Sequence, residues 1–148
     1  MEFYEVIESI EDSILTILKE ARLGVNNINW GDRARIGQLK PPVIWLFLVG
    51  SRPDYSGRSE YWVFNFDVVG IVESTDPYEG WREANKLGGR AASVLVKSRA
   101  PVDGKVKWAA QARWVKRAGY RPAYMRVPQK QLQAVAFSME VGFLFREP

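Results

Sequence analysis

Two long segments of the chain alternate apolar and polar side chains with a strict period of two. This period places successive side chains on opposite faces of a β-strand, so each segment predicts a strand with one apolar face. In residues 61–73 the apolar face holds Trp62, Phe64, Phe66, Val68 and Val72, and the other face holds Asn65, Asp67 and Glu73. In residues 131–146 the apolar face holds Val135, Phe137, Met139, Val141, Phe143 and Phe145. Apolar faces of this length require a covering layer.

Two further segments complete the predicted sheet. Residues 43–49 form a continuous apolar run, which is typical of a central strand covered on both faces. Turn residues 50–58 join this run as a hairpin to the strand at 61–73. Residues 105–117 alternate again, with Val106, Trp108, Ala110, Ala112 and Trp114 on one face and Lys107, Gln111, Arg113 and Arg117 on the other. Residues 118–128 are predicted to form a loop.

Helices are predicted over residues 2–22 and 78–97, where apolar side chains recur every three or four positions. Asp76 is placed to cap the second helix, with Pro77 at its first position and Glu79 completing a capping box. Gly88 and Gly89 lie inside this helix, and each costs roughly 1 kcal/mol relative to alanine. We therefore expect another backbone to approach the helix closely at these glycines.

The predicted order is α-β-β-α-β-β, which gives an α+β fold. The sheet is expected to be mainly antiparallel and four-stranded, with two helices packed on one face. The 148 residues are expected to form a single domain over 1–148. Residues 24–42 are left as a long connection containing Trp30, Arg33 and Arg35. We leave open whether Trp30 anchors this segment to the core or belongs to an interface.

The chain contains no histidine and no cysteine. This removes the commonest general base, thiolate nucleophiles, disulfides and zinc–thiolate sites. No phosphate-loop pattern accompanies Gly88 and Gly89. Asp67 and Glu73 share one strand face, but six residues separate them by roughly 20 Å, so both are interpreted as solvent-facing charges. We therefore expect neither an enzyme nor a bound metal or cofactor.

Charge is distributed unevenly along the chain. Residues 1–74 contain 11 acids and 7 bases, whereas residues 75–148 contain 6 acids and 14 bases. Such a chain can bind copies of itself head to tail, or bind nucleic acid through its basic half. The candidate residues for a subunit or DNA contact are Trp30, Arg33, Arg35, Lys105, Lys107, Arg113, Lys116, Arg117, Arg121 and Arg126.

Single-strand nucleic-acid platforms combine basic side chains with aromatic rings on one surface. In the predicted strand 105–117, Trp108 and Trp114 alternate with the basic residues and so point to the opposite face. We favour a buried aromatic face and a basic face that meets acidic groups. The acidic, periodic N-terminus is unlike a signal peptide, and the run 43–49 is too short to span a bilayer. A soluble protein with no membrane contact is expected.

The order and lengths of these segments, and their residue patterns, resemble those of the tail terminator, or tail completion, proteins of long-tailed bacteriophages. The resemblance is carried by the N-terminal helix, Lys40-Pro-Pro-Val43, the strand ending at Val69-Gly-Ile-Val72, the helix 78–97, and Ala134 to Val141 in the last strand. The strongly basic second half departs from that pattern.

This resemblance implies a structural virion protein that forms a ring, most simply a hexamer. The ring would cap the tail tube, end its polymerisation and join the tail to the head connector. Its partners would be the tail tube protein and the head–tail connector protein, and DNA would pass through the lumen without specific binding. The location would be the tail or neck of the virion, after assembly in the host cytoplasm. The alternative is a basic nucleic-acid-binding module that uses residues 105–130.

Overall fold

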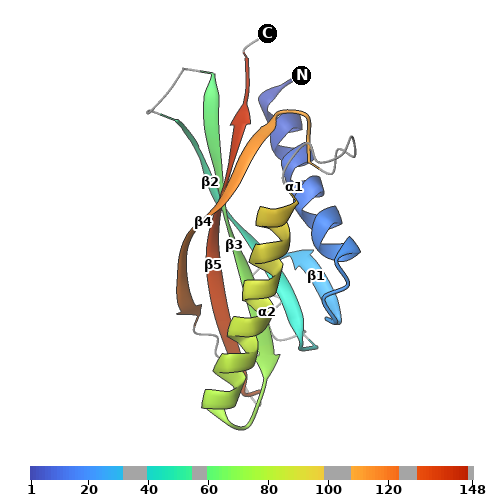
Figure 1. The fold of residues 1–148 in the computed structure, drawn as a ribbon, viewed down its shortest axis with the longest axis vertical. Helices are drawn as coiled ribbons and strands as arrows, with labels where there is room; N and C mark the ends of the chain where they lie inside the picture. The colour runs from blue at the N-terminus through green and yellow to red at the C-terminus, as the bar shows by residue number, and fades with distance from the viewer. Residues whose placement is uncertain (32–39, 55–59, 99–107, 124–129, 147–148) are drawn as a thin grey trace.

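The computed structural model describes residues 1–31, 40–54, 60–98, 108–123 and 130–146. These residues form an α+β fold, as predicted (Figure 1). In chain order its elements are helix α1 (Phe3–Glu20), strands β1 (Asn27–Trp30), β2 (Val43–Pro53) and β3 (Tyr61–Glu73), helix α2 (Pro77–Lys97), and strands β4 (Ala112–Ala123) and β5 (Leu132–Leu144).

The sheet has five strands in the order β1-β2-β3-β5-β4, rather than the four that were predicted. The additional strand, β1, runs parallel to β2, pairing Asn27 with Val43 and Trp30 with Leu46, so the sheet is mixed. The other neighbouring pairs are antiparallel. Strand β1 lies inside the segment interpreted as a long connection, because four residues are too few to display a strand period.

Strand β4 also differs from its prediction. It begins seven residues later than expected, and residues 118–123 belong to it rather than to a loop. Irregularities in its pairing with β5 fall between Ala112 and Trp114 and between Arg117 and Gly119, and each shifts the alternation of side chains. The first irregularity places Trp114 over Gly142, on the face opposite to Ala112, whereas Trp108 lies before β4 and joins the core beneath the helices.

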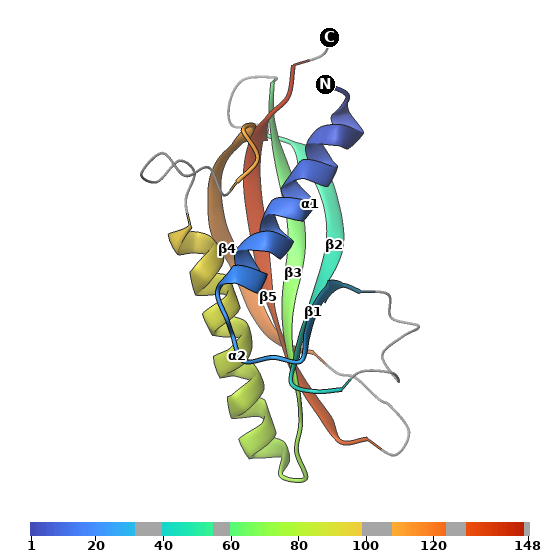
Figure 2. The ribbon, with the colours of Figure 1, turned by 90° about the vertical axis from the view of Figure 1, so that its right-hand side faces the viewer.

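Both helices lie on the same side of the sheet, as predicted (Figures 1 and 2). Helix α2 begins where Asp76 accepts hydrogen bonds from the N–H groups of Tyr78 and Glu79, at 3.0 and 3.3 Å. The Asp76 N–H donates to the Ser74 hydroxyl, at 3.2 Å, instead of to Glu79 as a capping box requires. At the start of helix α1 this contact of the capping box is present. The backbone N–H of Glu2 donates to the Glu5 carboxylate at 3.2 Å.

The principal core fills the space between the helices and the sheet. Its largest fully buried side chains include Ile10 and Ile14 of α1, Phe64 and Phe66 of β3, and Phe143 of β5. The predicted apolar faces of β3 and β5 both point into it. The first four residues of β2 are buried on both faces, as expected for an internal strand. Alternation along the two long strands therefore determines which side of the sheet the helices cover.

Helix α2 lies directly on the backbone of β3. A Cβ atom added at Gly70 would come within 2.7 Å of both the Ala84 carbonyl oxygen and the Gly88 nitrogen. A Cβ at Gly88 would come within 2.9 Å of the Phe137 ring. The predicted close approach of another backbone is therefore confirmed at Gly88, whereas at Gly89 the nearest atom is a ring carbon of Phe137 at an ordinary 3.5 Å. The packing of α2 against β3 offsets the unfavourable helix propensity of Gly88.

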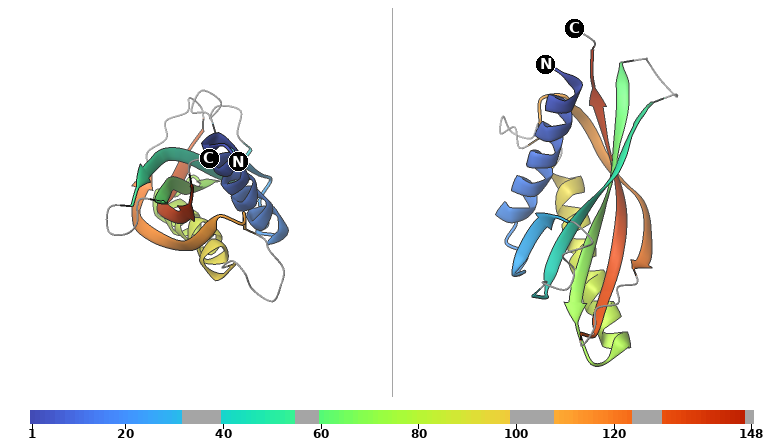
Figure 3. Two further views of the ribbon diagram at one scale, coloured as in Figure 1. Left: turned by 90° about the horizontal axis from the view of Figure 1, so that it is seen from above. Right: turned by 180° about the vertical axis from the view of Figure 1, so that it is seen from behind.

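Strong twist shapes the sheet (Figure 3). The N-terminus of α1 and the end of β5 lie at the same end of the molecule (Figures 1 and 2). Phe3 packs there against Phe143 and Phe145, with ring centroids 5.9 and 5.1 Å apart. In the described ranges, no helix has the length and apolar character needed to cross a membrane.

Alanine substitution at two glycines tests the contact between α2 and β3. Gly70→Ala should lower the free energy of unfolding by about 1–3 kcal/mol, because its methyl group would overlap backbone atoms of α2. Gly89→Ala is the matched control, since its Cβ would lie an ordinary 3.5 Å from the Phe137 ring. The control should match or exceed the wild-type stability by up to about 1 kcal/mol. Denaturant unfolding measures both variants, and a Gly70→Ala protein as stable as wild type would contradict the close approach.

Candidate functional site

The predicted contact residues do not form one surface. Arg33, Arg35, Lys105, Lys107 and Arg126 lie outside the described residues. The five that are described point in different directions: Trp30 into the core, Arg113 onto its own backbone, Lys116 and Arg121 over the helix-free face of the sheet, and Arg117 toward α2. Ordinary alternation in β4 separates Lys116 from Arg117, and the irregularity between Arg117 and Gly119 places Arg121 on the same face as Lys116.

Trp30 anchors β1 to the core. This is one of the two roles that the sequence left open for it, the other being a place in an interface. Its ring is edge-on to Phe64 at 6.2 Å and tilted against Phe66 at 6.0 Å. The indole N–H donates to the Glu11 carbonyl oxygen of α1 at 3.3 Å. Arg113 has a local role as well, because it donates to the carbonyl oxygens of Ala110 and Ala112, at 2.6 and 3.2 Å.

The helix-free face carries a network around Asp67. This side chain was predicted to face solvent, but the residue is only 8% exposed. Its carboxylate accepts hydrogen bonds from Arg121 at 2.9 Å and from the Ser138 hydroxyl at 3.0 Å. Arg121 also donates to Ser138 at 3.1 Å. The prediction failed because Arg121 was assigned to a loop, whereas β4 brings it alongside β5 and within reach of β3.

A second network lies beside the first. The Glu140 carboxylate is 3.5 Å from Arg52 of β2 and 3.5 Å from Lys116 of β4. The Lys116 ammonium also lies 5.0 Å from the centre of the Trp114 ring. Lys116 shares this face with Trp114 because the two residues are two positions apart in β4, with no irregularity between them. We call the two networks together the charged band, formed by Arg52, Asp67, Lys116, Arg121, Ser138 and Glu140.

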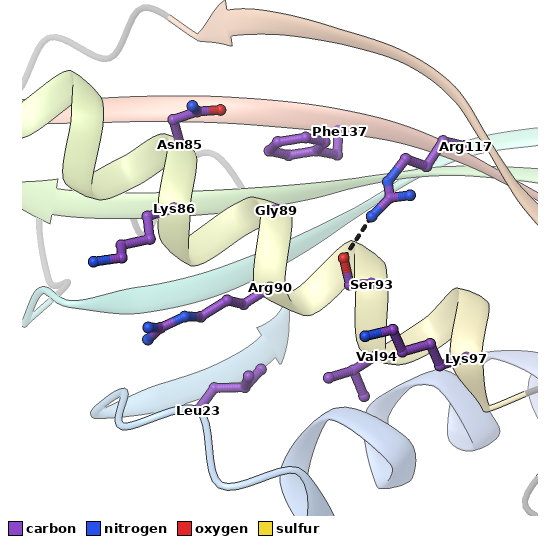
Figure 4. A pocket seen from close by; sticks show the side chains of 10 residues that line it. All are labelled: Leu23, Asn85, Lys86, Gly89, Arg90, Ser93, Val94, Lys97, Arg117 and Phe137. Atoms are coloured by element: carbon purple, nitrogen blue, oxygen red, sulfur yellow. Dashed lines mark hydrogen bonds between the residues drawn. The ribbon is translucent and has the colours of Figure 1, made fainter.

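The helix side of the molecule contains a pocket of about 780 Å³ along α2 (Figure 4). Four exposed basic side chains line it, namely Lys86, Arg90, Lys97 and Arg117. Its apolar lining comes from Leu23, Val94 and Phe137, and the remaining lining residues are Asn85, Gly89 and Ser93. No carboxylate appears among the described residues that line it. We call this pocket the cationic groove.

Two features of the sequence build the cationic groove. Spacings of four and seven residues place Lys86, Arg90 and Lys97 along one side of α2. Gly89 has no side chain, which leaves room above the Phe137 ring. Arg117 reaches across from β4 and donates to the Ser93 hydroxyl (Figure 4). The helical spacing of these three bases is visible in the sequence, but the residues from β4 and Leu23 that complete the groove are not.

Helix α1 presents the opposite charge. Its acidic face is formed by Glu5, Glu8, Glu11 and Asp12. Burial raises the pKa of the Glu11 carboxyl above its ordinary value, and the neighbouring Asp12 and Glu8 carboxylates raise this pKa further. None of the ion pairs among the described residues involves this acidic face, and none involves Lys86, Arg90 or Lys97. Both surfaces therefore carry charge that the described part of the chain does not neutralise.

The described residues contain no group of three or more acidic side chains arranged to hold a metal ion. The serine of the charged band, Ser138, donates to Asp67 and accepts from Arg121, so its hydroxyl connects these two charged side chains.

Comparison with protein-family models and with curated protein sequences finds no match for this chain. The possible roles of the chain are therefore inferred from its charged surfaces and from the pattern of its sequence.

The raised pKa of Glu11 predicts a pH-dependent effect on stability. A raised carboxyl pKa means that the protonated side chain stabilises the fold, and that this contribution is lost as pH rises through the raised pKa. Glu11→Gln keeps the side chain neutral, so the variant should unfold at a higher temperature than wild type at neutral pH. This advantage should shrink as pH falls toward about 4, near the ordinary glutamate pKa. Thermal unfolding across this range is the measurement, and a difference that does not vary with pH would contradict the assignment.

Proposed function

We propose that this chain is a structural subunit of a ring that caps the tail tube of a long-tailed bacteriophage. The ring would end tail polymerisation and join the tail to the head connector in the neck of the virion. The resemblance of the sequence to tail terminator proteins supports this proposal, as does the α+β fold with both helices on one side. One observation carries it: the subunit holds separate acidic and cationic surfaces that are not neutralised within the described chain.

A ring requires two different, complementary patches on each subunit. The acidic face belongs to the first half of α1, which extends toward the end of the molecule where β5 ends (Figure 2). The cationic groove follows α2 and includes Leu23, just beyond the other end of α1. Because the two patches lie apart, contact between copies would be head to tail. Repeated head-to-tail contacts close into a ring when the rotation between subunits permits it.

A structural role also agrees with how the charged band is arranged. Both of its carboxylates are already bound by basic side chains of the same chain, Asp67 by Arg121 and Glu140 by Arg52 and Lys116. The role would require no cofactor or metal. Six subunits would follow from the family resemblance, with DNA passing through the lumen without specific binding.

The alternative function, a nucleic-acid-binding module, is supported by one arrangement on the helix-free face. Trp114 and Lys116 lie together there, and Arg121 follows on the same strand. Aromatic rings beside basic side chains are used to bind single strands. The structural role is favoured because Lys116 and Arg121 each pair with a carboxylate, which reduces the positive charge available to phosphates.

Self-association should depend on salt. If oppositely charged surfaces of neighbouring copies meet, salt screens their attraction, since the Debye length falls from about 30 Å at 0.01 M to about 8 Å at physiological ionic strength. We expect light scattering after size-exclusion chromatography to show a multisubunit species at low salt that dissociates as salt rises. A protein that remains monomeric at high concentration and low salt, and that binds no tail tube, would contradict the proposed function.

DNA binding separates the two candidate functions. The ring account predicts weak, sequence-independent binding that disappears at moderate salt, because phosphate contacts release counterions and weaken steeply with salt. Fluorescence anisotropy of labelled duplex and single strands, measured at several salt concentrations, provides the affinity. Submicromolar binding that persists at physiological salt, or clear discrimination between sequences, would support the nucleic-acid-binding module instead.

A further inference from the structure

The cationic groove has the features of a docking site for an amphipathic acidic segment. Basic side chains line a floor made partly of Leu23, Val94 and Phe137. A bound segment would therefore meet cations at the rim and apolar side chains at the floor. Lys86, Arg90 and Lys97 are exposed and take part in none of the ion pairs among the described residues.

Helix α1 offers a segment with matching chemistry. Glu5, Glu8 and Asp12 follow one another at spacings of three and four residues, so they lie along one side of the helix. Tyr4 lies one turn before Glu8 and is 62% exposed. This stretch therefore combines a row of carboxylates with an exposed aromatic ring. An aromatic ring of this kind can be buried against an apolar floor.

The two surfaces also match in spacing. Glu8 and Asp12 are four residues apart, and so are Lys86 and Arg90. A rise of 1.5 Å per residue gives steps of about 6 Å on both helices. Two helices packed side by side could then bring both acids opposite both bases. Within the single chain, no ion pair among the described residues joins the acids of α1 to the bases of α2.

We infer that the cationic groove of each subunit receives the acidic face of α1 from a second copy of this chain. The inference rests on the proposed function and specifies which surfaces would form the ring contact. Nucleic acid fits the groove less well, because Phe137 is the only aromatic side chain that lines it among the described residues and is only 9% exposed. The apolar floor would also leave phosphates beside Leu23 and Val94.

Charge-reversal variants test this contact. Lys86→Glu with Arg90→Glu reverses the groove, and Glu8→Lys with Asp12→Lys reverses the acidic face. Each pair should raise the dissociation constant for self-association at least about 10-fold, because like charges would face each other. Sedimentation velocity at low salt measures this constant. All four changes in one chain should restore association, because the two surfaces are again complementary. Thermal unfolding identifies any variant that fails to fold.

A control pair with the same change in net charge is Lys40→Glu with Arg146→Glu. Both residues are exposed and lie outside the cationic groove, and Arg146 pairs with Glu60. We expect this pair to change the dissociation constant by no more than about 3-fold, as for other exposed charges. The control separates loss of a specific contact from a general effect of net charge.

The results distinguish the inferred contact from the proposed function. If the wild-type protein associates but reversal of the groove has no effect, or if the fourfold variant does not recover, the contact is wrong while a ring remains possible. If the wild-type protein is monomeric under all conditions and binds no tail tube, both are wrong. If the groove variant instead abolishes DNA binding by a monomeric wild-type protein, the groove is a nucleic-acid site and the inferred contact is overturned.

Discussion

The direct contact of α2 with β3 fixes most of what the surface of this protein presents. Gly70 and Gly88 let the helix backbone lie on the strand at a distance that a methyl group would prevent. Phe137 then packs against Gly88, and the next residue, Gly89, leaves space above the same ring. Gly88 therefore lets the helix pack closely on the sheet, and Gly89 leaves the space that forms part of the cationic groove. The bases of α2 border this space because the helix is held in that position.

The charged side chains on the two sides of the sheet differ in how far they form ion pairs within the chain. On the helix-free face, Asp67 and Glu140 are bound by cations from β2 and β4, so the charged band is neutralised largely within the chain. On the helix side, the described residues leave the acids of α1 and the bases of α2 without ion pairs. The pKa of Glu11 is raised mainly by burial and further by the neighbouring carboxylates of Asp12 and Glu8, so like charges on α1 also repel one another. Association between copies would bring together the charges that folding leaves apart.

Much of the fold could be predicted from local pattern, because long alternation and helical periodicity leave few alternatives. Strand β3 has the predicted bounds, and both helices and the hairpin of β2 with β3 were also predicted. Strand β1 was missed because its four residues pair with a distant strand without showing a period. The irregularities of β4 were missed because bulges leave no clear signal in composition. They moved Trp114 and Arg121 to unexpected positions, and so the charged band was not predicted. The cationic groove depends on how α2 meets β4 and Leu23, which only the folded chain brings together.

The central claim is that the subunit builds a closed assembly from two oppositely charged surfaces. The most direct test is the mass distribution of the purified protein at low salt, measured one particle at a time by mass photometry. A closed ring predicts one discrete multiple of the 16.9 kDa chain, with little of any larger species as concentration rises. A continuous ladder of masses, or a single monomer peak at every concentration, would contradict the account.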